Sequence, residues 1–452
     1  MEFVHRPYIP GETIAALATA PGEAGIAIVR ISGKNATDVA QKVFSKSVVK
    51  LKSHTVHYGK IILDGTCIDD VLLLVMRAPR SFTGEDTVEI HCHGGLVSKQ
   101  VLEACIKAGA KAASPGEFSF KAFVNGKLDL AQAEAIQTKI GAKNEIALTL
   151  AQDQLEGRLS HKILDLQSQL TDIAAIFEAW VDFPEEDLEF APFDDVIATL
   201  RTVMGQIQTL IASFDQGKVL QTGVAVSLIG SPNVGKSSLM NALLGKDRAI
   251  VSPIAGTTRD LVEDDMRLNN LHLRLIDTAG IRTTCESIEE EGIRRSKKAS
   301  LQSDIILYVL DVTCPQEIDF DLPPEKTIGV WNKMDLPHSR PLPQLPFDHV
   351  VELSAQNGQG LDKLHQAIDA LIWQKGAPRR DEVVITSLRH KEALAEALQC
   401  AERVVQGLLQ KQSAEFISFD MRQCLQALGT IVGANITEDI LTSVFSKFCI
   451  GK

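Results

Sequence analysis

The spacing of hydrophobic and polar residues changes along the chain, and the first part has a mixed pattern. Short apolar runs at 26–33 (IAIVRISG), 71–76 (VLLLVM) and 87–95 (TVEIHCHGG) predict strands. Residues 96–109 have the spacing of an amphipathic helix that stops at a glycine. Roughly the first 125 residues are therefore expected to form an α+β domain.

The pattern becomes helical from about residue 128 to residue 216. Apolar residues recur there every three or four positions among Ala, Leu, Gln and Glu, and PEEDLEFAPF (184–193) interrupts them. From GVAVSLIG (223–230) to about residue 375, short apolar runs alternate with helical ones, which predicts a parallel sheet. After KGAPRRDEVV (375–384) the helical pattern resumes and continues to the C-terminus.

This order predicts an α/β domain inserted into a helical domain. Insertion is tolerated where the two ends of the guest domain lie close together. We expect an N-terminal α+β domain at 1–125, a first helical segment at 126–216, the inserted domain at 217–378 and a second helical segment at 379–452.

Composition and charge narrow the class of protein. No apolar stretch approaches the roughly 20 residues of a membrane span, and the N-terminus lacks the features of a signal peptide. The eight cysteines are scattered without a CxxC pair, which suggests reduced thiols in the cytoplasm. The net charge of −12 argues against a nucleic-acid-binding surface over the whole chain. RNA would require a local basic patch or a more basic partner.

A phosphate-binding loop is predicted at GSPNVGKS (230–237), between a strand and a helix. Lys236 is expected to reach the β- and γ-phosphates, and the Ser237 hydroxyl to bind Mg²⁺. DTAG (277–280) ends a later strand, which would put its aspartate near the metal and the Gly280 N–H near the γ-phosphate.

Three further elements follow the phosphate loop. In GTTRD (256–260), Thr258 can complete the Mg²⁺ shell. In NKMD (332–335), Asp335 can accept hydrogen bonds from N1–H and the 2-amino group of guanine, which adenine does not offer in that place. SA (354–355) would close over the base. Five elements in this order predict a GTPase rather than an α/β domain with only a structural role.

The residue after DTAG is Ile281, where small GTPases carry the glutamine that orients the attacking water. Hydrolysis is therefore either feeble or assisted by another group. Residues 281–300 contain several glutamates as candidates. The alternative is a solvated helix with i, i+4 ion pairs such as Glu290–Arg294.

Two other groups of residues leave alternatives open. Glu89, His91 and His93 share one face of a predicted strand, but His-x-His supplies only two metal ligands, so a polar sheet face is the simpler interpretation. The terminal FCIGK places Cys449 four residues from the end, where it could be a lipid anchor, a nucleophile or part of a structural tail. The final Lys452 and the lack of a second signal disfavour lipidation. The preceding ITEDILTSVFSKF could also form a last amphipathic helix with Phe445 and Phe448 packed.

Several longer motifs make the chain closely resemble the MnmE (TrmE) family of tRNA-modifying GTPases. They are RISG, FTGEDTVEIHCHGG, SPGEFSFKAFVNGKLDLAQAEA, DFPEED, GSPNVGKSSLMNALLG, AIVSPIAGTTRD, DTAGIR and FCIGK. The resemblance implies a folate-binding-like N-terminal domain, a split helical domain and an inserted G domain. It also implies a homodimer without a membrane anchor that works with the flavoprotein MnmG (GidA). The pair would use a one-carbon tetrahydrofolate, similar to the 5-formyl form, to add an aminomethyl or carboxymethylaminomethyl group to C5 of the wobble uridine of certain tRNAs.

The resemblance also implies roles for individual residues. It assigns the folate to Arg30, Glu89, Lys127 and Lys452, and K⁺ to Asn233, Ser252, Ile254 and Thr257. Glu289 would position the attacking water, and the tail would reach the folate and tRNA site, with Cys449 catalytic or lining the site. The GTP-binding set is Asn233, Val234, Gly235, Lys236, Ser237, Ser238, Ser252, Pro253, Ile254, Ala255, Gly256, Thr257, Thr258, Asp277, Thr278, Ala279, Gly280, Asn332, Lys333, Met334, Asp335, Ser354, Ala355 and Gln356.

Two other functions compete with this interpretation. A switch protein for ribosome assembly would share the GTPase core, but the flanking folate-like and split helical regions argue against it. A folate-dependent enzyme could use GTP only for regulation, and would then need neither flavin nor the partner protein.

Overall fold

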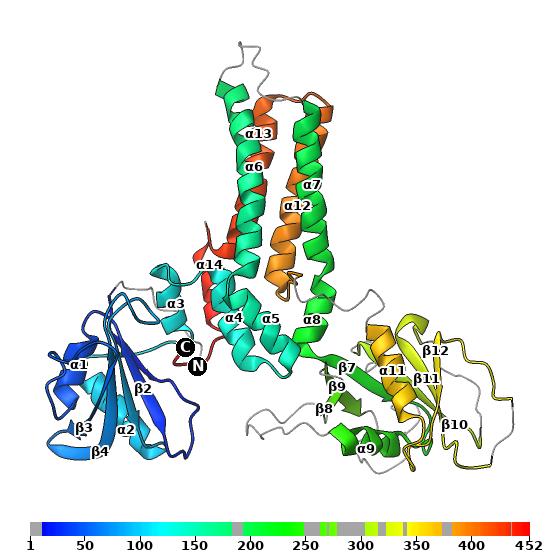
Figure 1. The fold of residues 1–452 in the computed structure, drawn as a ribbon, viewed down its shortest axis with the longest axis horizontal. Helices are drawn as coiled ribbons and strands as arrows, with labels where there is room; N and C mark the ends of the chain where they lie inside the picture. The colour runs from blue at the N-terminus through cyan, green and yellow to red at the C-terminus, as the bar shows by residue number, and fades with distance from the viewer. Residues whose placement is uncertain are drawn as a thin grey trace, which may run out of the picture. The chain divides into compact units, whose positions relative to one another are not determined.

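The computed structural model describes most of the chain. It describes residues 11–182, 193–247, 263–268, 271–277, 303–314, 322–337, 341–372, 382–434 and 436–452. The chain divides into two compact units, of which the first contains residues 1–140, 151–208 and 392–452, and the second 141–150 and 209–391. Both units can be followed by colour and label in Figure 1.

The first unit begins with a six-stranded sheet in the order β3-β4-β5-β2-β1-β6. Its strands are β1 (Ile14–Leu17), β2 (Ala27–Ser32), β3 (Thr55–Leu63), β4 (Thr66–Met76), β5 (Thr87–Cys92) and β6 (Lys111–Ala112). β6 runs parallel to β1, and the other neighbours are antiparallel. Helices α1 (Ala36–Val43) and α2 (Leu96–Lys107) contribute to its buried core.

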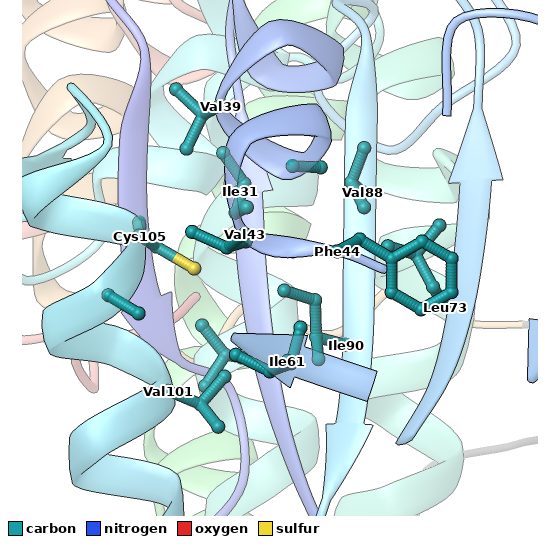
Figure 2. Close-up of a cluster of buried hydrophobic side chains, with 14 of the residues drawn as sticks. Ile31, Val39, Val43, Phe44, Ile61, Leu73, Val88, Ile90, Val101 and Cys105 are labelled. Carbon is teal, nitrogen blue, oxygen red and sulfur yellow. The ribbon is translucent and has the colours of Figure 1, made fainter. Parts of the chain in front are cut away.

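The core of this domain lies between α1, α2 and one face of the sheet (Figure 2). On β5, Val88, Ile90 and Cys92 are buried in this cluster, as their alternation predicts. Leu73 of β4 is fully buried beside them, and truncating such a side chain to alanine typically costs about 2–5 kcal/mol. The opposite face of the sheet is therefore free to carry polar groups.

A bundle of long helices makes up most of the rest of the first unit, and these helices confirm the helical pattern in the sequence. The helices of this part of the chain are α3 (Glu117–Val124), α4 (Leu130–Gly141), α5 (Glu145–Leu155), α6 (Arg158–Asp182), α7 (Phe193–Ala212), α12 (Leu388–Leu409), α13 (Ala414–Val432) and α14 (Glu438–Phe445). The start of α5, the end of α7 and the start of α12 belong to the second unit. Hydrogen bonds join neighbouring members: Lys162 of α6 to Gln206 of α7 at 2.7 Å, and Gln167 of α6 to the Leu425 carbonyl of α13 at 3.0 Å. α6 lies beside α13 (Figure 1).

The last helix, α14, packs against the segment that follows the N-terminal sheet. Phe445 is fully buried, with its ring centroid 5.2 Å from that of Phe120 in α3. Gly116, just before α3, has φ +70°, and a Cβ there would lie 2.6 Å from the Phe445 carbonyl oxygen. Phe448 is buried in the same cluster, so the prediction that both phenylalanines pack is confirmed.

The second unit contains a six-stranded sheet in the order β12-β11-β10-β7-β9-β8. Its elements are α8 (Phe214–Thr222), β7 (Val224–Ile229), α9 (Lys236–Asp247), β8 (Glu263–Leu268), β9 (Leu271–Asp277), β10 (Ile305–Asp311), η1 (Pro324–Lys326), β11 (Thr327–Asn332), β12 (His349–Glu352) and α11 (Leu361–Ile372). All pairs are parallel except β8 with β9, so the predicted parallel sheet is confirmed. β7 and β11 are buried at every position, as expected for strands covered on both faces.

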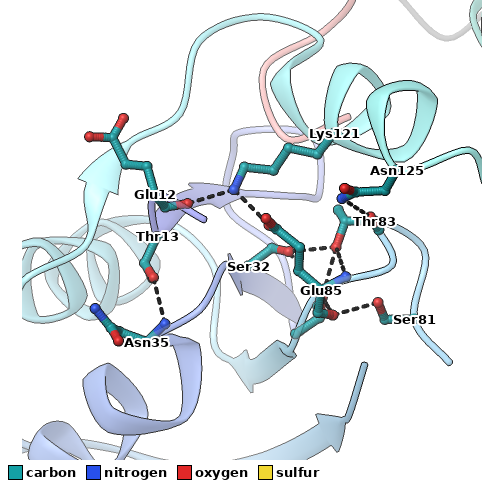
Figure 3. Close-up of polar contacts among 10 residues, drawn as sticks. Glu12, Thr13, Ser32, Asn35, Ser81, Thr83, Glu85, Lys121 and Asn125 are labelled. Carbon is teal, nitrogen blue, oxygen red and sulfur yellow. Dashed lines mark hydrogen bonds and ion pairs between the residues drawn. The ribbon is translucent and has the colours of Figure 1, made fainter. Parts of the chain in front are cut away.

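A buried lysine connects three segments of the N-terminal domain through hydrogen bonds (Figure 3). Lys121 of α3 has no exposed side-chain surface, and its Nζ donates to the Glu12 carbonyl at 2.5 Å and to Glu85 Oε2 at 2.7 Å. One turn later, Asn125 Nδ2 donates to the Thr83 carbonyl at 2.8 Å. Helix α3 is thereby fixed to the loop between β4 and β5 and to the segment that leads into β1.

The substitution Lys121→Met is expected to destabilise the protein by about 3–5 kcal/mol, because it leaves the largely buried Glu85 carboxylate without its cation. Urea unfolding followed by circular dichroism would measure the loss. The double variant Lys121→Met/Glu85→Gln removes the unpaired charge and should recover part of the stability. Equal stability of Lys121→Met and the unmodified chain would show that the ion pair is not a significant constraint.

Candidate functional site

The predicted nucleotide motifs at 230–237, 332–335 and 354–355, which the structure describes, lie at one edge of the second sheet. β7, β10, β11 and β12 are parallel, so the loops that follow their carboxyl ends lie at the same edge. The loop after β7 leads into α9, which begins at Lys236. Such a helix start, preceded by a glycine-containing turn, presents backbone N–H groups to an anion.

The loop 230–235 adopts a turn that few residues tolerate. Asn233 has φ +63° and Gly235 has φ +98°. A Cβ at residue 235 would lie 2.3 Å from the Asn332 side-chain nitrogen, so only glycine fits there. Lys236 Nζ donates to the carbonyls of Gly230 at 2.7 Å and Ser231 at 2.8 Å, which holds its ammonium against the loop itself.

Asn332 connects the phosphate loop to the predicted base-binding segments. Its side chain is buried; Nδ2 donates to the Val234 carbonyl at 2.9 Å, and Oδ1 accepts from the Ala355 N–H at 3.0 Å. One asparagine at the end of β11 therefore sets the spacing between the loop after β7 and the loop after β12.

The next residue, Lys333, forms a second bridge. It has φ +65°, and its Nζ donates to the Asn233 carbonyl at 2.9 Å and to Asp311 Oδ2 at 2.6 Å. Burial opposes ionisation of Asp311, but hydrogen bonds from Lys333 and Thr313 outweigh it and hold the Asp311 pKa below its usual value. Asp311 was not predicted from the sequence. The available signal was an acidic residue at the end of the buried run IILYVLD.

The predicted guanine-binding residues lie together. Ser354 Oγ donates to Asp335 Oδ1 at 2.5 Å, and the Met334 N–H donates to the Leu353 carbonyl at 3.2 Å. A carboxylate held at one oxygen keeps its other oxygen for N–H donors of a ligand. Gln356 is exposed next to Ala355.

Part of the predicted nucleotide site lies outside the described residues. These positions are Ser252, Pro253, Ile254, Ala255, Gly256, Thr257, Thr258, Thr278, Ala279, Gly280 and Glu289. Asp277 ends β9 in register with Leu228 of β7, next to the phosphate loop, but its side chain is not described. Ser237 and Ser238 are exposed in the first turn of α9.

A second group of predicted residues meets on the N-terminal sheet. Arg30 of β2 and Glu89 of β5 are register partners, and Arg30 Nε lies 2.8 Å from Glu89 Oε1. The Arg30 guanidinium also stacks over the Phe118 ring, 5.7 Å from its centroid. Both charged side chains are mostly buried, with exposed fractions of 17% and 14%.

The two histidines near Glu89 lie beside different carboxylates. His91 stays on the same sheet face; its Nε2 is 3.7 Å from Glu89 Oε2 and has no hydrogen-bond partner among the described residues. His93 lies beyond the end of β5, and its Nδ1 is 2.9 Å from Asp69 Oδ1. The expectation that all three side chains share a polar strand face therefore holds for Glu89 and His91, while His93 turns to Asp69. Among the described residues, His, Cys, Asp and Glu side chains form no group of three or more that could hold a metal ion.

The C-terminal tail reaches this pair within its own chain. Arg30 Nη1 donates to the Gly451 carbonyl at 3.3 Å, and the Gly116 N–H donates to the Cys449 carbonyl at 3.4 Å. Gly451 has φ +93°, and a Cβ there would lie 2.3 Å from the Leu17 carbonyl oxygen, so the tail lies directly against the end of β1. The Lys452 N–H donates to the Cys449 carbonyl at 3.3 Å, forming a closed turn.

Lys127 lies on a neighbouring segment, and its ammonium donates to the Pro79 carbonyl at 3.2 Å, not to Glu89.

Among the cysteines that the structure describes, Cys67, Cys314 and Cys449 are exposed. Burial raises the pKa of Cys92 to about 11, and that of Cys105 and Cys424 to about 12. Cys449 is thus an exposed thiol two residues before Gly451, whose carbonyl accepts from Arg30.

None of the helices in the described ranges is long and apolar enough to cross a membrane.

Two protein-family models match successive parts of the chain. Residues 13–127 match the GTP-binding protein TrmE N-terminus, and residues 130–449 match the MnmE helical domain. Among solved structures, the G domain of the T. maritima FeoB iron transporter is 26% identical and matches 33% of this chain and 98% of that chain, with a TM-score of 0.24.

Curated relatives match over the full length. The tRNA modification GTPase MnmE of Protochlamydia amoebophila is 57% identical over 460 residues, which cover 100% of both chains. The proteins of the same name from Chlamydia pneumoniae and Thermoanaerobacter pseudethanolicus are 44% and 40% identical, and each match covers 98% of this chain and 99% of the relative. The chain therefore belongs to the MnmE (TrmE) family of tRNA modification GTPases.

Proposed function

We propose that the protein hydrolyses GTP in order to modify tRNA. With a flavoprotein of the MnmG type, it would add an aminomethyl or carboxymethylaminomethyl group to C5 of the wobble uridine. The observation that carries the proposal is the full-length similarity to the tRNA modification GTPases, 57% in the most similar relative named above. We assign residues 217–378 to the G domain, 1–125 to the folate-binding-like domain, and 126–216 and 379–452 to the helical domain.

The nucleotide half of the proposal rests on the loops at the edge of the second sheet. Backbone N–H groups of residues 233–238 and the Lys236 ammonium would bind the phosphates, and Asp335 would select guanine. The hydroxyls of Ser237 and Thr258, with Asp277 nearby, offer the hard oxygen ligands that Mg²⁺ prefers. The bridge from Asn332 to both loops supports this, because it fixes the distance between phosphate and base sites.

We assign hydrolysis to Glu289 together with a potassium ion. The chain has Ile281 in place of a water-orienting glutamine, so another side chain would orient the water, and Glu289 offers a carboxylate for this. The Asn233 side chain is exposed in the phosphate loop, and Ser252, Ile254 and Thr257 would supply further oxygen ligands. A cation bound there would offset negative charge on the phosphates.

We assign the one-carbon folate to the Arg30–Glu89 face. Arg30 holds Glu89 Oε1, so Oε2 is available to accept from the N–H edge of a pterin. The His91 Nε2, which has no hydrogen-bond partner in the described structure, fits a polar ligand on this face. Lys127 and Lys452 would meet carbonyl or carboxylate oxygens of the folate, and Cys449 would line the site or act as its nucleophile.

The proposal also covers the oligomeric state of the protein and its cellular compartment. We expect a homodimer, because cation-assisted hydrolysis in the family pairs two G domains, and a hetero-oligomer with the flavoprotein. The substrate tRNA and the free cysteines of the described residues agree with a protein of the cytoplasm.

Nucleoside analysis of tRNA from a deletion strain tests the function directly. We expect loss of the C5 modification of the wobble uridine, restored by the full-length chain, with normal ribosome profiles. Unchanged tRNA nucleosides together with defective ribosomes would instead identify a ribosome-assembly switch. Modification that persists without the flavoprotein would identify a folate enzyme in which GTP is only regulatory.

GTP turnover is expected to require K⁺, because Ile281 cannot orient water and Asn233 offers an additional oxygen ligand. Hydrolysis would be measured in KCl and in NaCl at equal ionic strength, and the rate should be much higher in KCl. In the same assay, Glu289→Ala should lower kcat with little change in GTP affinity. Equal rates in the two salts would refute the potassium assignment.

Removing residues 449–452 is expected to abolish tRNA modification and leave GTP hydrolysis largely intact, since Arg30 would lose the Gly451 carbonyl. Gly451→Ala should weaken folate binding in the same direction, because its Cβ would clash with the Leu17 carbonyl. Nucleoside analysis and a GTP hydrolysis assay would test the truncated chain, and titration with 5-formyltetrahydrofolate would measure the folate affinity of Gly451→Ala.

Two single substitutions serve as controls for the tail. Ile450→Ala removes a side chain that is 54% exposed and should leave folate affinity unchanged. Cys449→Ser separates the thiol from the rest of the tail, and full modification by this variant would exclude a nucleophilic role. Loss of GTP hydrolysis in the truncated chain would show that the tail supports the whole fold.

A further inference from the structure

Six exposed lysines lie on consecutive segments that lead from β2 to the edge strand β3. They lie in the turn before α1, on α1, on the loop after it and on β3, and Figure 1 draws α1 and β3 at the same end of the domain. We call this row the lysine edge; it comprises Lys34, Lys42, Lys46, Lys50, Lys52 and Lys60. Asp38 is the one acidic residue between positions 33 and 60, whereas the whole chain has a net charge of −12.

Within the described parts of the chain, none of the six lysines forms an ion pair, whereas Lys107 pairs with Glu103 and Lys111 pairs with Glu12. Asp70 lies opposite Lys60 in the β3–β4 register, and its carboxylate accepts from the Tyr58 hydroxyl at 3.0 Å. Six lysines against Asp38 and Asp70 leave these segments with an excess of positive charge.

The loop that carries the central lysines is held along β3. The Ser45 N–H donates to the Lys60 carbonyl at 2.9 Å, and the Lys60 N–H donates to Ser45 Oγ at 2.9 Å. At the far end of the loop, the His54 N–H donates to the Val75 carbonyl at 2.6 Å. Two of the ammonium groups lie along the surface, because Lys42 donates to the Ala108 carbonyl at 2.8 Å and Lys46 to the Tyr58 carbonyl at 2.6 Å. The backbone that carries the lysines is thus fixed, which favours a repeated set of contacts along an extended ligand.

An aromatic side chain and a connection to the proposed folate face add to the surface. Tyr58 is 60% exposed, and Lys46 Nζ lies 5.9 Å from the centroid of its ring. Arg77 donates to the Val49 carbonyl at 3.2 Å, joining the lysine edge to the loop whose Pro79 carbonyl accepts from Lys127. A chain bound along the edge would end beside that loop.

We propose that the lysine edge binds the phosphate backbone of RNA, and, on the basis of the proposed function, that this RNA is the substrate tRNA. Exposed lysines without an ion-pair partner bind phosphates through charge, with release of counterions and without reading sequence. Protein–protein interfaces are depleted in lysine, so an acidic partner protein is the less suitable ligand. Exposed tyrosine beside lysine is also typical of RNA-binding surfaces.

The test compares two triple variants of the full-length chain that remove equal charge. Lys46→Gln/Lys50→Gln/Lys52→Gln neutralises the edge, and Lys99→Gln/Lys107→Gln/Lys111→Gln neutralises three exposed lysines on α2 and β6. The affinity for unmodified tRNA would be measured over a range of KCl concentrations. Removal of three phosphate contacts should lower the slope of log K against log salt by about 3 and weaken binding at least about tenfold at low salt.

The control triple is expected to change the slope little, and both variants should keep wild-type GTP hydrolysis. Equal slopes for the two variants, or no measurable tRNA binding by the wild-type chain, would overturn the proposal. Unchanged tRNA affinity with lost flavoprotein binding would assign the edge to a protein partner instead. These results are independent of nucleoside analysis: if the deletion strain lacks the modification but the edge variant binds tRNA normally, the RNA site is wrong and the proposed function stands.

Discussion

The packing of Phe445 against the segment around Gly116 determines where the end of the chain lies. Phe445 is completely buried among aromatic rings of α3, and Gly116 is the residue whose missing side chain allows that approach. From this anchor, the hydrogen-bonded residues 446–449 lead the chain towards Gly451, whose backbone carbonyl accepts from Arg30 of the Arg30–Glu89 pair. The polar face of the N-terminal sheet, the last helix and the tail therefore form one structural unit, and the chemistry assigned to that face depends on a hydrophobic contact outside it.

In the second unit, hydrogen bonds from two side chains connect loops that are far apart in the sequence. Asn332 and Lys333 are adjacent in sequence, yet each connects a different pair of loops at the carboxyl edge of the sheet. A buried amide with both ends satisfied is rigid and costly to disturb. Two consecutive residues at the end of β11 thus transmit any movement of the phosphate loop to the segments after β10 and β12.

Local patterns in the sequence predicted the features that depend on neighbouring residues. The alternation of apolar and polar residues on β5 correctly predicted its buried face. The helical spacing before FCIGK correctly predicted that Phe445 and Phe448 are packed. The pairing of Lys121 with Glu85 was not predictable, because an isolated lysine in a helix has no local mark of burial and its partner is 36 residues away. His93 follows the strand parity in sequence but turns to Asp69 because β5 ends one residue earlier. Asp311 was missed for a similar reason: its partner Lys333 comes from another strand.

The contact between Arg30 and Gly451 also has a consequence for biosynthesis. The two residues are 421 positions apart in the chain. During translation the N-terminal sheet can fold early, as domains generally do, but its polar face gains the Gly451 carbonyl only after residue 451 has been synthesised and has left the ribosome. Before that point the sheet can be complete while Arg30 still lacks this contact. The docking of residues 449–451 is therefore a late step in the folding of the N-terminal site.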